Sequence, residues 1–91
     1  MKATKQFKIG ECAVGGIIKV ELDGNILHVK ALDYNTKKEL GGQYTGSFQV
    51  DHRGSKGWID TYLNELTSSY YAEKVMEWIA TKVEFKSEFN W

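Results

Sequence analysis

Proline is absent from the sequence, cysteine occurs once, and the charges cancel, with 12 Lys or Arg residues against 12 Asp or Glu. The single cysteine, Cys12, excludes an intramolecular disulfide, and no Cys or His pair stands at the spacing of a standard zinc site. One cysteine is also typical of a reducing compartment, so we expect a cytoplasmic location. The balanced charge argues against a nucleic-acid coat protein, because such binding usually needs a positive field.

Long hydrophobic runs are missing as well. After the Lys-containing start, only seven uncharged residues, 12–18, follow one another before Lys19 interrupts them. Such a run is too short for a signal peptide or a membrane span. We therefore expect no membrane partner.

The residues that are present indicate one folded domain over residues 1–91. Hydrophobic residues make up 42% of the chain, charged residues 26% and aromatic residues 13%. These shares are ordinary for a globular protein, and the aromatic content argues against disorder. A chain of this length has room for one core, and its sequence shows no internal repeat or linker.

Apolar residues tend to alternate with polar ones between about residues 6 and 50, as they do in antiparallel strands. The clearest strands are 17–22 and 26–34, which flank Gly24, a residue that permits the positive φ of a tight hairpin. Further strands are expected at 7–13 and 39–50, the second one bent or at an edge because of its glycines. A turn is expected at 33–38.

The alternation also sorts side chains between the two faces of this sheet. We expect the opposite face, which carries Leu32, to be polar and wet. The side chains predicted to share the core face are Ile18, Val20, Leu22, Leu27, Val29, Ala31, Tyr44, Phe48 and Val50.

The apolar spacing changes to three or four residues after Gly57, which predicts amphipathic helices within about residues 56–83. Ser55 is the expected N-cap, and the polar residues 67–69 separate two helices. The predicted fold is therefore α+β, a four-stranded antiparallel sheet followed by two helices packed on one face, in the order ββββαα. The apolar helix positions are Trp58, Ile59, Tyr62, Leu63, Leu66, Tyr71, Val75, Trp78, Ile79 and Val83.

The C-terminal tail, residues 84–91, places Phe85, Phe89 and Trp91 at alternate positions. Three interpretations stay open for it. It is a short fifth strand, a cover for an open end of the core, or an aromatic element that docks a partner.

No group of residues indicates catalysis or a cofactor. A nucleophilic Cys12 would need a general base in reach and a third group to orient it, and neither His28 nor His52 is placed by the sequence to serve. Asp51 precedes His52, but neighbours on an extended segment point apart and no nucleophile accompanies them. We expect no enzyme activity, no cofactor and no metal ion.

A protein-binding function fits the aromatic residues best. We expect Trp58, Trp78 and Tyr62 to be core residues and Tyr70, Phe89 and Trp91 to contact a partner, since exposed aromatic side chains are enriched at interfaces. The partner is another protein or a second copy of the chain in a homodimer. Such a chain serves as an adaptor or a stoichiometric inhibitor of the compact kind that phages and mobile elements encode.

The alternative function is the binding of single-stranded nucleic acid. A Gly-rich basic loop, residues 51–58, runs into the start of the first predicted helix, and the outer sheet face carries further cations and one aromatic ring. Backbone N–H groups at a helix start and a basic sheet face both suit phosphates. The residues of this alternative are His52, Arg53, Lys56, Lys19, His28, Lys30 and Tyr34.

Overall fold

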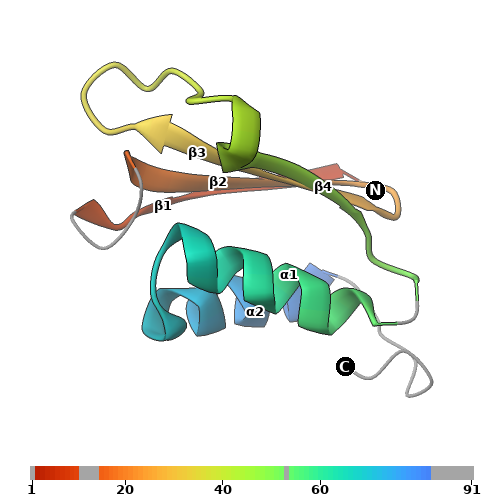
Figure 1. Ribbon diagram of the computed structural model, residues 1–91. Helices are drawn as coiled ribbons and strands as arrows, with labels where there is room; N and C mark the ends of the chain where they lie inside the picture. The colour runs from red at the N-terminus through yellow and green to blue at the C-terminus, as the bar shows by residue number, and fades with distance from the viewer. Residues whose placement is uncertain (1, 11–14, 53, 83–91) are drawn as a thin grey trace.

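The computed structural model describes residues 2–10, 15–52 and 54–82. Within this part of the chain, four antiparallel strands precede two helices, and both helices pack on one face of the sheet (Figure 1). The predicted α+β fold, with its order ββββαα, is confirmed. The elements are β1 (Lys2–Lys8), β2 (Gly16–Asp23), β3 (Ile26–Asp33), the 3-10 helix η2 (Gly42–Tyr44), β4 (Thr45–Gln49), α1 (Ser55–Leu66) and α2 (Ser69–Lys82).

The hairpin between β2 and β3 forms where the sequence predicts it. Asp23 pairs with Ile26, so Gly24 and Asn25 make a two-residue turn, and Gly24 has a φ of 63°. A side chain at this φ would crowd the backbone, which is why the turn favours glycine. The spatial order of the strands is β1-β2-β3-β4, so β1 and β4 form the two edges of the sheet.

The core lies between the sheet and the helices, on the predicted face. Burying one large aliphatic side chain contributes about 1.5–3 kcal/mol, so this cluster provides most of the stabilisation. Tyr44 and Phe48 pack against it while half-buried. Its buried members are Ile9, Ile18, Val20, Leu22, Leu27, Val29, Ala31, Val50, Ile59, Leu63, Leu66, Ala72, Val75 and Ile79.

The first strand lies earlier in the chain than predicted. It runs from Lys2 to Lys8 and pairs Phe7 with Ile18, whereas the sequence places it at 7–13. Backbone pairing with β2 extends β1 through Lys and Thr positions where no apolar alternation marks a strand. Cys12 and the rest of residues 11–14 lie outside the described residues.

The outer face of the sheet is not wet throughout. Ile17 and Leu32 point to this face, yet they are only 0% and 3% exposed. The segment after β3 folds back over this end of the sheet, on the side opposite the helices (Figure 1). Glu39 forms a bridge with Leu32, and Leu40 lies so close to Gly15 that a Cβ there would come within 2.9 Å of Leu40 Cδ1. The prediction that Leu32 belongs to a wet face is therefore wrong.

The fourth strand is shorter than predicted. Only Thr45–Gln49 of the expected 39–50 forms β4, and η2 comes directly before it. Gly41 and Gly42 have φ values of 71° and 55°, which interrupt an extended chain. The turn at 33–38 is present, since Lys37 N–H donates to the carbonyl oxygen of Asp33 over 2.8 Å.

The two predicted helices are confirmed, with Thr67 and Ser68 between them. Neither α1 nor α2, within the residues that the structure describes, combines the length and apolar character needed to cross a membrane. The aromatic tail, residues 84–91, lies outside the described residues, so its three interpretations stay predictions.

Candidate functional site

Two adjoining hollows lie where the edge strand β4 meets helix α1, and together we call them the β4–α1 groove. The larger has a volume of about 410 Å³ and is lined by Phe48, Trp58, Thr61, Tyr62 and Glu65. The smaller has a volume of about 280 Å³ and is lined by Ser47, Phe48, Gln49, His52, Gly54, Ser55 and Trp58.

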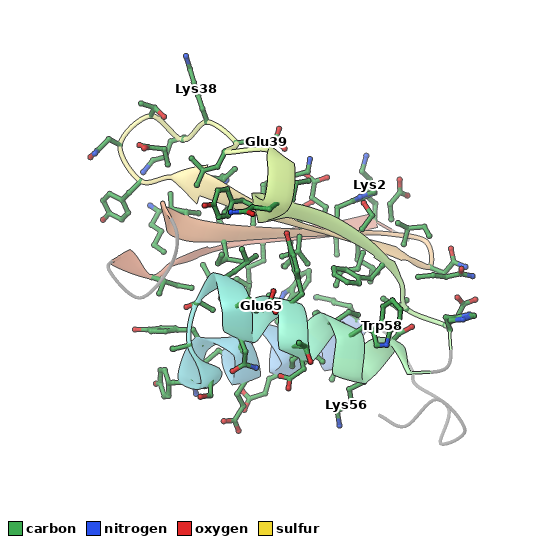
Figure 2. All side chains as sticks on the ribbon, viewed as in Figure 1. Lys2, Lys38, Glu39, Lys56, Trp58 and Glu65 are labelled. Carbon is green, nitrogen blue, oxygen red and sulfur yellow. The ribbon has the colours of Figure 1, made fainter. Side chains whose placement is uncertain are left out.

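The helical wall of the groove is one stripe of α1. Trp58, Thr61, Tyr62 and Glu65 recur at the spacing of a single helix face, beside the core stripe that begins with Ile59. Figure 2 shows Trp58 and Glu65 along α1, below β4. Tyr62 of this stripe packs against Phe48 of β4, whereas Trp58 stays exposed beside the edge of the sheet.

Trp58 is 76% exposed, so the prediction that it is a core residue is wrong. One residue corresponds to about 100° of rotation around a helix, and the neighbouring Ile59 points straight into the core. The indole of Trp58 is thereby turned to the flank of α1, where it lines both hollows of the groove. Tyr62 and Trp78 are half-buried and pack against the core.

Ser55 fixes the position of α1 relative to β4. It is not the N-cap as predicted: Gly54 is the N-cap residue, with a φ of 85°, and Ser55 is the first residue of the helix. The Ser55 hydroxyl, which is buried, lies 2.5 Å from the carbonyl oxygen of Gln49 and 2.6 Å from that of His52. It thus ties the end of β4 to the first turn of α1, one turn before Trp58.

The floor of the groove is built by two rings. The centroids of Phe48 and Tyr62 are 5.3 Å apart with an interplanar angle of 56°, a favourable tilted arrangement. Gly46 makes room for them, because a Cβ on it would lie 3.1 Å from the Tyr62 ring and 3.2 Å from that of Phe48. The Tyr62 hydroxyl donates to the carbonyl oxygen of Gln43 over 2.8 Å. Burial, together with the nearby Glu65, raises the pKa of Tyr62.

The open edge of β4 borders the groove. Val50 N–H donates to the carbonyl oxygen of Asn25 over 2.8 Å, and β4 pairs with β3 in the same register. Because bonded pairs alternate in an antiparallel ladder, Gly46 and Phe48 direct their N–H and C=O groups at β3. Thr45, Ser47 and Gln49 direct theirs away from the sheet.

The partner-binding residues that the sequence predicts are only partly placed. Tyr70 is 62% exposed at the start of α2, with its ring edge-on to Tyr71 and Lys74 Nζ 5.4 Å from its centroid. It stands at the opposite end of the helix pair from Trp58. Phe89 and Trp91 lie outside the described residues. The contacts of all three with a partner remain predictions.

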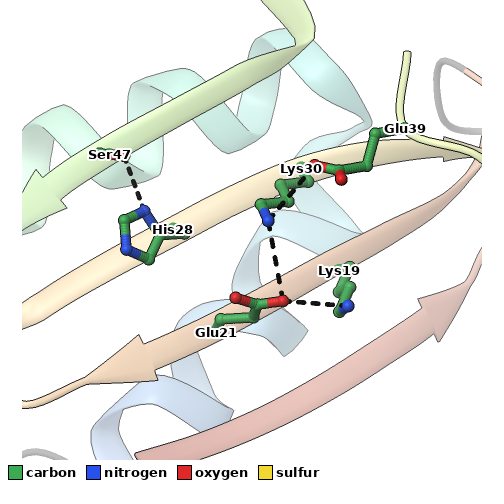
Figure 3. Close-up of polar contacts among 6 residues, drawn as sticks. All are labelled: Lys19, Glu21, His28, Lys30, Glu39 and Ser47. Carbon is green, nitrogen blue, oxygen red and sulfur yellow. Dashed lines mark hydrogen bonds and ion pairs between the residues drawn. The ribbon is translucent and has the colours of Figure 1, made fainter. Parts of the chain in front are cut away.

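Three residues of the nucleic-acid alternative, Lys19, His28 and Lys30, do share the outer sheet face (Figure 3). Glu21 stands between the two lysines, with its Oε1 3.0 Å from Lys19 Nζ and 3.8 Å from Lys30 Nζ. Its hydrogen bond with Lys19 holds the pKa of Glu21 below its usual value. Lys30 also pairs with Glu39 over 3.3 Å. These ion pairs reduce the positive charge that this face presents to phosphates.

The remaining residues of that alternative lie elsewhere. His52 and Lys56 flank the start of α1, and Lys56 points away from the sheet on the side of the helices (Figure 2). Tyr34 is 48% exposed in the turn after β3, with Lys37 Nζ 4.6 Å from its ring centroid. Arg53 is outside the described residues. The structure therefore does not bring this set together on one surface.

Metal-binding groups do not gather in this fold as far as it is described: residues 2–10, 15–52 and 54–82 contain no cluster of three His, Cys, Asp or Glu side chains that could hold an ion.

The sequence does not indicate the β4–α1 groove. Its residues come from two segments whose approach is a tertiary contact, and the one local signal is a Gly in the middle of a predicted strand. Protein-family models, curated proteins and solved structures yield no match to the chain.

Proposed function

We propose that this protein is a small, non-enzymatic binding protein that engages another polypeptide through the β4–α1 groove. The observation that carries the proposal is the exposed indole of Trp58 beside a hollow floored by Phe48 and Tyr62. Aromatic residues of this kind dominate the binding energy of interfaces, and a large exposed ring costs solubility unless a partner uses it. An adaptor or a stoichiometric inhibitor in the cytoplasm would act in this way.

The open edge of β4 suggests how the partner binds. An extended segment can add to a sheet edge, where backbone hydrogen bonds supply affinity and pockets for side chains supply specificity. Ser47 offers both its N–H and its C=O at this edge, and the adjacent hollow is walled by Trp58 and Glu65. One apolar side chain of the bound segment would fill that hollow.

Site-specific photo-crosslinking tests the proposal for a partner of any sequence. The photoreactive benzoylphenylalanine replaces Trp58 in one variant and Tyr70, the matched exposed aromatic, in another. After irradiation in the cells of origin, we expect the variant at position 58 to give one discrete adduct above the chain mass of 10.4 kDa.

A Ser47→Pro substitution should weaken that adduct, since proline removes the outward N–H. Adducts at position 70 with none at position 58 would move the binding surface to the start of α2 and refute the proposal. Equal, unspecific labelling at both positions would refute it as well.

A further inference from the structure

We infer that the occupant of the β4–α1 groove is a second copy of this chain, joined edge to edge at β4 about a two-fold axis that passes through Ser47. The inference rests on the proposed function, because it names the partner of the same surface. Four features of the described residues support it: the backbone groups at the edge, the width of the helix layer, the side chains of the groove and the distribution of charge.

The backbone groups of β4 are self-complementary about Ser47. Thr45 N–H already donates to the carbonyl oxygen of Gly42, and the Gln49 carbonyl already accepts from Ser55 and His52. Within the described residues, the edge therefore offers the Ser47 N–H and C=O, the Thr45 C=O and the Gln49 N–H.

An antiparallel copy centred on Ser47 sets each Thr45 opposite the partner's Gln49. The two groups that are already engaged, Thr45 N–H and Gln49 C=O, then face each other. Each Gln49 N–H meets a Thr45 C=O, and the two Ser47 residues exchange two bonds. Every outward group that is still open obtains a partner, which an arbitrary extended peptide does not guarantee.

The helix layer ends where the sheet ends. Strands are spaced by about 4.8 Å and packed helices by about 8–10 Å, so two helices cover about four strands. In this fold α1 contacts β4, the last strand, and α2 packs against α1. Pairing two β4 edges would therefore bring the two α1 helices into contact at the same time.

The stripe of α1 that would meet its copy is also self-complementary. The Tyr62 ring lies against Gly46 and Phe48, the two neighbours of Ser47, so an axis through Ser47 passes α1 close to residues 61 and 62. For antiparallel helices related by this axis, Trp58 would lie opposite the partner's Glu65, and Thr61 opposite its Tyr62. Each exposed indole would thus enter the hollow of about 410 Å³ that the partner's Phe48 and Tyr62 floor. The indole N–H would have the Glu65 carboxylate as an acceptor.

Charge does not oppose this contact. The sequence of β4, TGSFQ, has no charged residue, and the chain has a formal net charge of zero. The other edge, β1, has the sequence KATKQFK with three lysines and no acid, so two β1 edges would repel each other. Self-association is thereby directed to β4.

Sedimentation velocity of the full chain over about 1–500 µM tests the inference, because a small interface is expected to give micromolar affinity. We expect a reversible monomer–dimer equilibrium. Ser47→Pro and Trp58→Ala should each raise its dissociation constant about tenfold or more, the effect of losing a central contact. Gln6→Pro, the matched change at an outward N–H of β1, should leave it unchanged.

Single-cysteine crosslinking, in a Cys12→Ser background, tests the position of the axis and keeps the inference testable if the proline variant does not fold. A residue on a two-fold axis lies beside its own copy, with about 5.5 Å between Cα atoms in a bonded pair. Ser47→Cys should therefore crosslink to itself with a short bis-maleimide. Thr45→Cys alone should not, because its copy is about 14 Å away along the strands. A mixture of Thr45→Cys and Gln49→Cys should crosslink.

The outcomes separate this inference from the proposed function. A monomer at every concentration would overturn the inference. If the photoreactive group at position 58 then captures a different protein, the proposed function stands and only the second copy is wrong. If the group instead links internally to residues 84–91, the chain covers its own groove, and both the inference and the proposed function are wrong. A dimer that Ser47→Pro and Trp58→Ala leave intact would place the interface elsewhere and overturn the inference.

Discussion

The two edges of the sheet are built in opposite ways. β1 carries Lys2, Lys5 and Lys8 and lines neither hollow of the β4–α1 groove, whereas β4 is uncharged and borders the exposed ring of Trp58. Lysines on an edge strand discourage pairing with another chain, while an uncharged edge invites it. Charge therefore protects the β1 edge from pairing, whereas the β4 edge has no such protection.

The largest effect is expected from filling the space that Gly46 leaves under the groove. Gly46→Val would push its side chain into the Tyr62 and Phe48 rings, because a Cβ at this position would lie only 3.1 and 3.2 Å from them. Overpacking of this kind costs about 1–3 kcal/mol, so the urea midpoint should fall. Gln6→Val on the exposed side of β1 is the control and should change the free energy of unfolding by no more than about 0.5 kcal/mol. Equal losses at both sites would show that β4 is no better supported than β1.

Exchanging the charges of the edges should reverse their behaviour. Thr45→Lys with Gln49→Lys is expected to weaken self-association about tenfold, or about 1.4 kcal/mol, and added salt should restore part of it. Lys2→Thr with Lys8→Thr should instead open β1, so that species larger than a dimer appear in sedimentation. The contrast between the edges is lost if neither double variant changes the distribution of species.

Tyr62→Phe removes the hydroxyl that bonds to the Gln43 carbonyl, just before β4, and keeps the ring beside Phe48. It therefore tests one contact at the β4 edge and leaves β1 unchanged. The lost hydrogen bond to Gln43 should cost about 0.5–1.5 kcal/mol at neutral pH. The pKa of Tyr62 is raised above its ordinary value of 10.0 in the folded chain, chiefly by burial. The stability due to the neutral phenol is thus complete below pH 10, and it is lost as the pH rises through the folded pKa. Unfolding between about pH 9 and 12 should be less pH-dependent in the variant; an identical pH profile would contradict this assignment.

The smallest effect is expected from the ion pairs between the edges, on β2 and β3. Glu21→Gln removes the contact to Lys19 and Lys30, and exposed ion pairs contribute only about 0–1 kcal/mol. The pKa of Glu21 is lowered from its ordinary value of 4.5, so its contribution is present above that pH and is lost as the pH falls through the folded pKa. The variant should therefore lose less stability on acidification than the parent chain.

The same variant tests the nucleic-acid alternative. Glu21→Gln leaves Lys19 without its ion-pair partner, while Lys30 keeps its pair with Glu39. If the outer face can bind phosphates, the variant should therefore bind labelled single-stranded DNA or RNA more tightly at low salt than the parent chain does, and this binding should fall steeply as salt rises. Strong binding by the unchanged chain would favour that alternative over the protein-binding proposal. No binding by either chain would show that the outer face is a solvated surface.

The spacing of apolar residues in the sequence predicts those strands and helices that bury one face and expose the other. The hairpin at Gly24, both helices and the core face follow from it, because burial selects apolar residues at fixed intervals. The bounds of β1 do not follow, since its residues are held by backbone pairing with β2. The predicted β4 is too long because strand alternation continues through glycines that adopt positive φ.

The groove escapes prediction for a different reason. Helical spacing alone does not reveal whether a stripe beside the core faces the sheet or passes its edge. That spacing predicts Trp58 as a core residue, and only the position of α1 under the last strand turns it outward. The pairing of Phe48 with Tyr62, 14 residues later, is likewise a property of the folded chain.

The contacts of the Ser55 hydroxyl with the Gln49 and His52 carbonyl oxygens have a consequence for dynamics. Since one side chain holds the final carbonyl of β4 and the first turn of α1, fraying of either requires release of the other. Amide protons on both sides of residues 50–54 should then exchange with solvent at a common rate, as members of one cooperative unit. A bound polypeptide would slow that exchange across the whole unit, well beyond the residues it touches.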